Sequence, residues 1–227
     1  EAIRQINANR DRLRTINEMR AEDKPKITGA EALSIHIASQ VMPPAAFQDL
    51  ADRLIAALKE RPGLDTSKGR LVMVGAELDE PEYIEAIESQ GALVVGDLLC
   101  FGGRSVLAPH DENAADPLDE IGRSYFFSSS CARMIGDFPK RWDELNELYR
   151  KVDGDGVIFE RIIFCDPWGA DLHNIMHRIE KENTFPLLSL TREYNIVPTG
   201  QVKTRVQAFL EKLEIAKAQK AAAGGER

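Results

Sequence analysis

The stretch DGVIFERIIFCDPWG, at residues 155–169, constrains the fold more than any other part of the chain. Its two apolar runs, Val157–Phe159 and Ile162–Phe164, predict a buried strand that leads directly to Cys165. Because Pro167 cannot extend a strand ladder, we expect the strand to turn here before a helix begins. A thiol is therefore predicted at the carboxyl end of a buried strand, which is where open α/β sheets bind their ligands.

Strand-like and helix-like patterns alternate on both sides of this stretch. Buried strands are predicted at 71–74, 92–99, 157–164 and 185–190, and helices at 79–90, 118–127, 138–152, 170–183 and 199–219. Such alternation is typical of βαβ units, whose strands are parallel and whose crossovers are right-handed. The predicted fold class is therefore α/β, with a doubly wound, mostly parallel four-stranded sheet of the flavodoxin or Rossmann type.

The first part of the chain contains helical patterns only. Helices are predicted at about 1–23, 30–42 and 45–61, and proline or glycine residues separate them. We therefore expect a helical segment at 1–66 and an α/β domain at 67–227. Since the first helix starts at Glu1 without a methionine or a cap, we expect the segment to link to a missing amino-terminal domain of a longer subunit.

The charge balance excludes several classes of protein. The formal net charge is −8 at pH 7, which argues against a general nucleic-acid binder or a polybasic membrane-surface protein. No apolar run approaches the ~20 residues of a membrane span, and no charged-then-apolar leader opens the chain. We expect a cytoplasmic protein whose partners are proteins or small molecules.

The cysteines are Cys100, Cys131 and Cys165, spaced by about thirty residues without a CxxC pair. This spacing does not indicate a disulfide framework, and it leaves buried thiols, a redox site or part of a metal site as alternatives. A cysteine at a strand end is commonly a small buried apolar residue, and spacing alone favours this interpretation of Cys165; a ligand or redox role, which the turn beside it supports, is the alternative. His173 and His177 have i, i+4 spacing without an HExxH motif, so zinc is not indicated.

Four loops should leave the carboxyl ends of the strands and meet at one edge of the sheet. They are predicted at 75–79, 100–104, 165–169 and 191–201. Arg104 and Arg192 are candidate cations for a substrate, with Asp97 as a possible ion-pair partner of Arg104. Gly200 and Gln201 could present helix amides to an anion, although an ordinary capped helix is the favoured interpretation. The absence of GxGxxG and GxxxxGK[ST] argues against conventional dinucleotide and nucleotide sites.

Three segments, in this order, resemble the carboxyl-terminal half of the 2-hydroxyacyl-CoA dehydratase and benzoyl-CoA reductase family. They are RLVMVGAELDEPEYIEAIESQGALVVGDLLCFGGR, DGVIFERIIFCDPWG and PTGQVKTRVQAFLE. The helical opening, with NANRDRLRTINEMR and ITGAEAL, resembles the middle of the family, so the resemblance covers most of the chain. CFGGR, and the ARM that follows Cys131, favour the benzoyl-CoA reductase branch, with a 2-hydroxyacyl-CoA dehydratase subunit as the alternative.

The resemblance implies a heterodimer of two related subunits, each with a [4Fe-4S] cluster held by three cysteines. By motif, Cys165 corresponds to the ligand in the carboxyl-terminal half. The other two ligands have no counterpart in this chain, so Cys100 and Cys131 are not expected to replace them. The implied partners are a paralogous cluster-bearing subunit, an ATP-hydrolysing activator with its own iron–sulfur cluster, and an aromatic acyl-CoA, whose thioester receives a low-potential electron.

Two functions of other classes remain open. A scaffold subunit would shape the interface while its paralogue does the chemistry, and it would contain no cluster. A flavodoxin-like electron carrier suits the fold, but the first predicted strand is not followed by an evident phosphate-binding loop.

Overall fold

The computed structural model describes residues 1–128, 130–194 and 200–224, with side chains as far as residue 219. The helices are α1 (Ala2–Ala21), α2 (Gly29–Val41), α3 (Pro44–Glu60), α4 (Pro81–Glu88), α5 (Pro117–Ser128), α6 (Phe138–Lys151), α7 (Asp166–Glu182) and α8 (Gly200–Gly224), with short 3₁₀ turns η1 (Gly103–Ser105) and η2 (Ile135–Asp137). The strands are β1 (Arg70–Gly75), β2 (Leu93–Leu98), β3 (Gly156–Ile162) and β4 (Leu187–Arg192). None of the helices in these ranges has the length and hydropathy that a membrane span requires.

The strands form one sheet in the order β2-β1-β3-β4, and every neighbouring pair is parallel. The chain steps outward from β1 to β2 and then crosses back over β1 to reach β3, so the direction of winding reverses between β1 and β3. The predicted α/β fold with a parallel four-stranded sheet is confirmed. In sheets of this kind, ligands bind outside the carboxyl ends of the strands at such a reversal.

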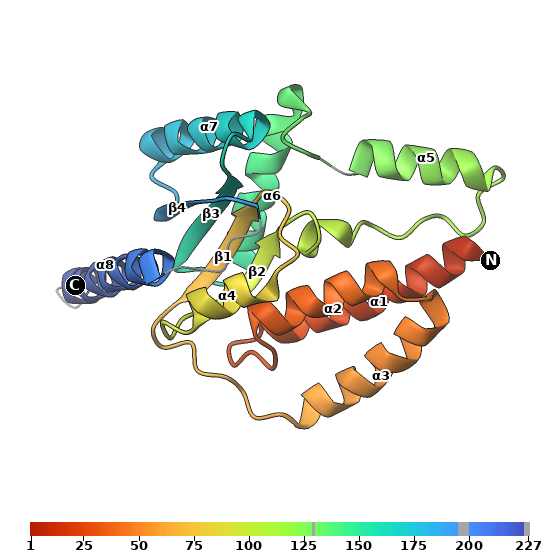
Figure 1. Ribbon diagram of the computed structural model, residues 1–227, viewed down its shortest axis with the longest axis horizontal. Coiled ribbons are helices and arrows are strands. Elements are labelled where there is room, and N and C mark those ends of the chain that lie inside the picture. Colours follow the sequence, from red (N-terminus) through yellow and green to blue (C-terminus); the bar gives the residue numbers. More distant parts are fainter. Residues whose placement is uncertain (129, 195–199, 225–227) are drawn as a thin grey trace.

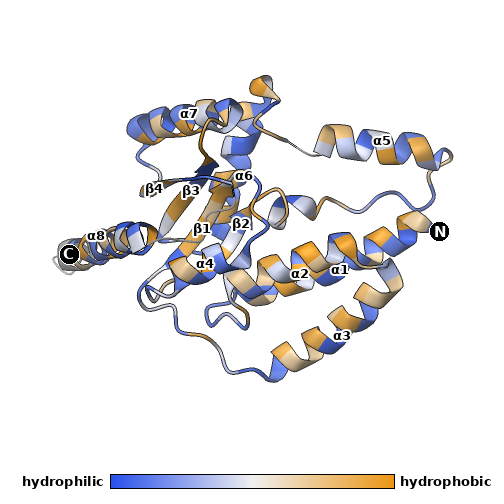
Figure 2. Cartoon of the chain, viewed as in Figure 1, coloured by the Kyte–Doolittle hydropathy of each residue, from blue (hydrophilic) through white to orange (hydrophobic). Residues whose placement is uncertain are grey.

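Helices cover both faces of the sheet (Figure 1). Leu71 and Met73 of β1 pack toward a cluster that includes α2, α4 and α8, whereas Val72 and Val74 pack toward α6 and α7. This follows from the two-residue period of a strand, which sends successive side chains to opposite faces. Because both faces are covered, the middle of each central strand is a continuous apolar run, at 71–74 in β1 and 157–159 in β3 (Figure 2).

Helices α1 and α2 pack along the edge of the sheet formed by β2, and α3 packs on these two helices (Figure 1). They share a small core of their own, which includes Ile16, Met19, Ile27, Ala32 and Leu58. Helices α1 and α2 also contact β2, and α2 contacts α4. The helical segment is therefore packed against the α/β part, and the boundary at residue 66 stays a prediction.

The chain around Cys165 differs from the prediction. Strand β3 ends at Ile162, and the next two residues are not buried: Ile163 is 39% exposed and Phe164 is 90% exposed. Phe164 has a φ of +64°, in the left-handed region, which turns the chain out of the sheet. The predicted strand as far as residue 164 is therefore too long.

Helix α7 also begins earlier than predicted, at Asp166 rather than at residue 170. Cys165 is its N-cap residue and Pro167 lies in its first turn. A proline is well tolerated there because the first helical N–H groups have no partner within the helix. Pro167 therefore opens the helix rather than only ending the strand.

Two other elements bear on the site. Strand β4 lies two residues further along the chain than predicted, so Arg192, expected in a loop, is its last residue. Helix α5 matches the predicted helix closely, but it has no buried residue and projects away from the sheet (Figure 1). Its position cannot be read from local sequence pattern, because packing rather than propensity decides where a helix lies.

Candidate functional site

A cavity of about 420 Å³ lies beside the carboxyl ends of the strands, and we call it the thiol cavity. The loops after β1, β2, β3 and β4 and the segment after α5 all contribute to it. The residues that line it are Glu77, Cys100, Phe101, Cys131, Ala132, Arg133, Cys165, Pro167, Trp168 and Tyr194. The predicted meeting of the strand-end loops is thus observed, and it places the cavity at the reversal between β1 and β3.

All of the cysteines, Cys100, Cys131 and Cys165, line this cavity, and each is a half-buried free thiol. The sequence placed Cys100 and Cys165 in loops predicted to meet at this edge, and it left the position of Cys131 open. Nothing local in the sequence could have placed Cys131 here, because it follows the projecting helix α5 and only the path of the chain returns it to the sheet. The structure thus brings together thiols that are far apart in sequence.

Aromatic side chains form part of the wall of the thiol cavity. Trp168 is buried and packs edge-to-face on Phe159 of β3, with ring centroids 5.9 Å apart. This contact fixes the first turn of α7, and with it Cys165, against the sheet. Phe101 and Tyr194 add further aromatic surface. A cavity with such walls can exclude water from a bound group.

Arg104 sits beside the cavity, as predicted for this loop. Its guanidinium lies 4.8 Å from the centroid of the Trp168 ring, and its Nη1 donates to Cys100 Sγ at 3.7 Å. Burial raises the pKa of the Cys100 thiol, and the positive charge of Arg104 acts in the opposite direction. The arginine is therefore positioned between an aromatic face and a thiol, where it can attract negative charge.

The expected pairing of Asp97 with Arg104 is wrong, because Asp97 pairs with Arg20 of α1 instead. Arg20 Nη1 lies 2.6 Å from Asp97 Oδ2. The other carboxylate oxygen, Oδ1, accepts from the amides of Leu99 and Gly103 at 3.1 and 2.7 Å. This ion pair holds the loop that carries Cys100, and sequence reasoning missed Arg20 because it lies in a separate helix.

Arg192 lies behind the thiol cavity, and its side chain is only 3% exposed. Its Nε lies 2.6 Å from Glu160 Oε1, in an ion pair that lacks hydrogen-bond alignment. Its Nη2 donates to the carbonyl of Glu77, a residue of the cavity wall. Burial raises the pKa of Glu160 to about 7, although Arg192 opposes this. Arg192 thus supports the wall from inside, and its predicted contact with a substrate stays a prediction.

The remaining predicted positions lie outside the cavity lining. Gly200 and Gln201 are exposed in the first turn of α8, and their predicted role in anion binding stays a prediction. Residue 199, where the last helix was predicted to begin, falls outside the described residues. His173 and His177 are exposed on α7.

Thiolates are the usual ligands of iron–sulfur clusters. Cys165 lines the thiol cavity together with two further thiols, those of Cys100 and Cys131. The donor chemistry therefore fits a cluster in kind, with Cys165 as one ligand. However, no group of three His, Cys, Asp or Glu side chains converges closely enough to hold a metal ion within the described part of the chain. A complete ligand set would need groups beyond these residues or a rearrangement of the cavity.

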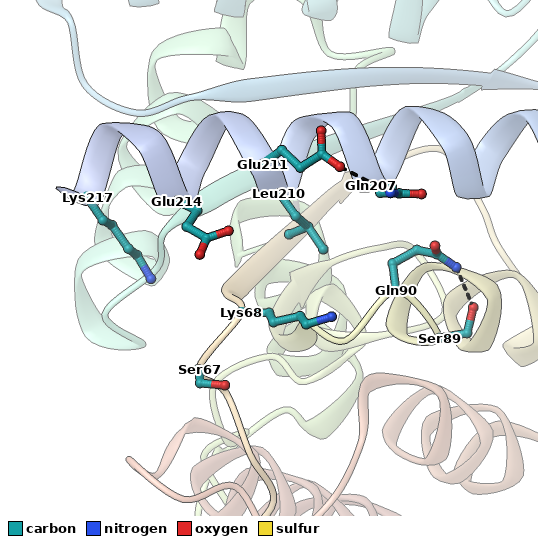
Figure 3. Close-up of a pocket in the computed structure, with 9 residues that line it drawn as sticks. All are labelled: Ser67, Lys68, Ser89, Gln90, Gln207, Leu210, Glu211, Glu214 and Lys217. Atoms are coloured by element: carbon teal, nitrogen blue, oxygen red, sulfur yellow. Dashed lines mark hydrogen bonds between the residues drawn. The ribbon is translucent and has the colours of Figure 1, made fainter. Parts of the chain in front are cut away.

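A larger cavity, of about 600 Å³, lies near the amino ends of β1 and β2, beside α8 (Figure 3). It is lined by Ser67, Lys68, Ser89, Gln90, Gln207, Leu210, Glu211, Glu214 and Lys217. Lys217 is already paired with Asp155 at 2.7 Å. Its lining contains no cysteine and no aromatic residue, so the thiol cavity is the better candidate despite its smaller volume.

Comparison with known proteins gives a consistent result. The family model described as "2-hydroxyglutaryl-CoA dehydratase, D-component" matches residues 1–213. The chain is 25% identical over 144 residues to the (R)-phenyllactyl-CoA dehydratase beta subunit of Clostridium sporogenes, covering 63% of this chain and 38% of that protein. It is 22% identical over 207 residues to the lactoyl-CoA dehydratase subunit beta of Anaerotignum propionicum, covering 91% of this chain and 55% of that protein.

A third relative is the putative dehydratase subunit YjiM of Escherichia coli (strain K12), which is 25% identical over 133 residues, or 58% of this chain and 34% of that protein. The chain thus spans between about a third and just over half of the length of these curated relatives. The family model nevertheless matches nearly all of it. The chain belongs to the 2-hydroxyglutaryl-CoA dehydratase D-component family.

Proposed function

We propose that this chain is part of a subunit of a 2-hydroxyacyl-CoA dehydratase, an enzyme that eliminates water from a 2-hydroxyacyl-CoA thioester. The observation that carries the proposal is the thiol cavity, which lies at the ligand-binding edge of the sheet in a chain of this family. The two relatives with a printed substrate are dehydratase subunits. These relatives favour the dehydratase alternative over the benzoyl-CoA reductase branch that the sequence motifs suggested.

The chemistry of the cavity is compatible with this activity. A bound [4Fe-4S] cluster would supply single-electron transfer to the thioester, and Cys165 is the residue we assign to hold it. Arg104 and Arg133 would place positive charge near the negative charge that develops on the thioester oxygen. Phe101, Trp168 and Tyr194 would exclude water from the reacting group.

The proposal includes partners. Two relatives are named as beta subunits, so a second, related subunit is expected to complete the enzyme. An ATP-hydrolysing activator with its own iron–sulfur cluster would deliver the electron, because this chain has no nucleotide phosphate motif of its own.

Iron and acid-labile sulfide in the anaerobically purified full-length subunit test the cluster assignment. We expect Cys165→Ala to lose iron and the EPR signal of the reduced cluster, while Cys131→Ala, which changes the same cavity, keeps most of its iron. A Cys165→Ala variant with full iron content would rule out Cys165 as a ligand.

Activity tests the substrate class. With partner and activator present, the full-length subunit should dehydrate lactoyl-CoA or phenyllactyl-CoA and should not reduce benzoyl-CoA. Reduction of benzoyl-CoA without dehydration would instead restore the reductase alternative.

A scaffold subunit is the second candidate. It is favoured by the lack of a converged metal-binding group among the described residues. A full-length subunit that assembles with its partner but contains neither iron nor sulfide would support this function.

A further inference from the structure

A further cavity, which we call the α7 cavity, adjoins the thiol cavity. It has a volume of about 330 Å³ and lies between the first turns of α7 and the segment that precedes α6. It is lined by Ala132, Arg133, Ile135, Asp166, Pro167, Ala170, Asp171 and Asn174. Ala132, Arg133 and Pro167 also line the thiol cavity, so the two cavities are neighbours that share part of their walls.

The wall that faces α7 is held in place by a buried arginine. Arg141 of α6 donates through Nε and Nη2 to the two carboxylate oxygens of Asp171, at 2.6 and 2.7 Å. Its Nη1 donates to the hydroxyl of Ser130 and to the carbonyls of Cys131 and Met134, at 3.1, 2.8 and 2.9 Å. A paired arginine and carboxylate of this kind fixes geometry as well as charge. The walls of the α7 cavity are therefore firmly placed, as in most binding pockets, which are largely pre-formed.

The α7 cavity is suited to an apolar group. Ala132, Ile135, Pro167 and Ala170 give it apolar walls. Ile135 is 81% exposed, and an apolar group that covers it removes apolar surface from water, which favours binding.

The charges in the lining disfavour an acidic group. Asp171 is already neutralised by Arg141. Arg133 also lines the thiol cavity, where the proposed function directs it to the thioester oxygen, whereas Asp166 lines the α7 cavity alone. A carboxylate bound here would therefore lie near Asp166 without a cation of its own, and such a juxtaposition of like charges is unfavourable.

We propose that the α7 cavity binds the substituent on C3 of the 2-hydroxyacyl group and selects a large, uncharged, apolar substituent such as a phenyl ring. The inference rests on the proposed function, since it requires the thioester to lie in the thiol cavity. From there the acyl chain would pass Pro167 to reach the α7 cavity. Lactoyl-CoA carries only hydrogen on C3 and would leave the α7 cavity unfilled.

The ratio of kcat/KM for phenyllactyl-CoA to kcat/KM for lactoyl-CoA tests this assignment, because the two thioesters differ only by a phenyl group on C3. The full-length subunit is assayed with its partner and activator. We expect Ala170→Leu, which fills the cavity from an exposed helical position, to lower the ratio at least tenfold. This is the scale expected in an apolar pocket, where a single methylene changes specificity ~10–200-fold.

Ala56→Leu on α3 is the matched control, since Ala56 is also exposed on a helix but lies outside both cavities. It should leave the ratio within twofold of wild type. An unchanged ratio in Ala170→Leu would overturn the inference, while dehydration of lactoyl-CoA by the same enzyme would leave the proposed function standing.

A second variant changes the cavity without filling it. Ile135→Ser removes part of the apolar wall and should lower the same ratio severalfold. Ile215→Ser is its control, because Ile215 is exposed on α8 away from the cavity. Circular dichroism and a urea midpoint establish that each variant is folded, and Ile135→Ser decides the outcome if Ala170→Leu is not.

The charge of the substituent gives an independent test. In 2-hydroxyglutaryl-CoA the substituent on C3 ends in a carboxylate, so wild-type enzyme should use this thioester at least tenfold less efficiently than phenyllactyl-CoA. A preference for 2-hydroxyglutaryl-CoA would overturn the inference.

Calorimetry separates failure of the inference from failure of the proposed function, because the affinity of the full-length subunit for each thioester requires no turnover. If wild-type enzyme dehydrates none of these thioesters, the proposed function fails. Tighter binding of phenyllactyl-CoA than of lactoyl-CoA, lost in Ala170→Leu, would then still support the α7 cavity as the site of the substituent. Equal affinities for the two thioesters would overturn it.

Discussion

Arg20 and Asp97 form a buried ion pair that joins helix α1 to the loop carrying Cys100. Both side chains are 1% exposed, and the nitrogen and oxygen lie 2.6 Å apart. Burial alone would raise the pKa of Asp97, but Arg20 and the hydrogen bond from Gly103 hold it below its usual range. The pair therefore couples the helical segment to the edge of the thiol cavity.

The first prediction concerns this pair. Asp97→Ala leaves the Arg20 charge buried without its partner, and breaking a buried pair in this way costs about 3–5 kcal/mol. We expect the free energy of unfolding in urea to fall by an amount of this order. Asp119→Ala is the control, because it removes the exposed pair with Arg123 and should change stability far less. Equal losses of unfolding free energy in the two variants would show that the buried Arg20–Asp97 pair contributes no more to stability than an exposed pair.

The second prediction concerns pH. The pKa of Glu160 is raised by burial from 4.5 to about 7 in the folded protein. Between these values the folded state binds a proton that the unfolded state has released, so stability falls as pH rises through this window. The contribution is on the order of 3 kcal/mol at most. We expect wild-type protein to lose more stability between pH 5 and pH 8 than Glu160→Gln does, as measured by urea unfolding.

Comparing the two proteins removes the effect of other groups. Burial lowers the pKa of His36 to about 4, and this contribution changes stability in the opposite direction, since it is lost as pH falls below 6.5. It is present in both proteins and therefore cancels. Identical pH profiles would show that Glu160 is ionised throughout.

The third prediction concerns Phe164, whose φ of +64° is unfavourable for a residue with a Cβ atom. Its side chain is 90% exposed, so little packing is lost when it is replaced. A left-handed conformation costs most residues roughly 1–2 kcal/mol. Phe164→Gly should therefore raise the urea midpoint, whereas the β-branched Phe164→Val should lower it. The same direction of change in both variants would contradict this explanation.

The fourth prediction concerns the reactivity of Cys100. Arg104 lowers the pKa of this thiol against the larger effect of burial. Removing the charge in Arg104→Gln should raise the pKa, reduce the thiolate fraction and slow alkylation by iodoacetamide several-fold at pH 8, because a full unit of pKa corresponds to a tenfold change. Peptide mass spectrometry reports the rate at each cysteine. Arg133→Gln, in the same cavity lining, is the control and should have a smaller effect.

The sequence by itself determined the class of fold and the edge at which a site would form. Continuous apolar runs such as Val157–Phe159 are typical of strands buried on both faces, and amphipathic helices such as α6 have a period of about 3.6 residues, so both are local patterns. Their alternation required parallel strands, and parallel strands place their carboxyl-end loops together. The motif around Cys165, together with two further segments, also indicated the family to which the chain belongs, whereas the benzoyl-CoA reductase branch that the motifs favoured is not supported by the relatives.

Only the tertiary structure decided which side chains meet. Cys131 joins Cys100 and Cys165 in one cavity because of the path taken by the chain after α5, which no local pattern records. Arg20 reaches Asp97 across 77 residues of sequence. Arg192 is buried against Glu160 because β4 continues two residues beyond its apolar run. Local patterns arise from neighbours in sequence, whereas ion pairs and cavities depend on the packing of elements that are distant in sequence. Sequence patterns therefore predicted the elements but not these contacts.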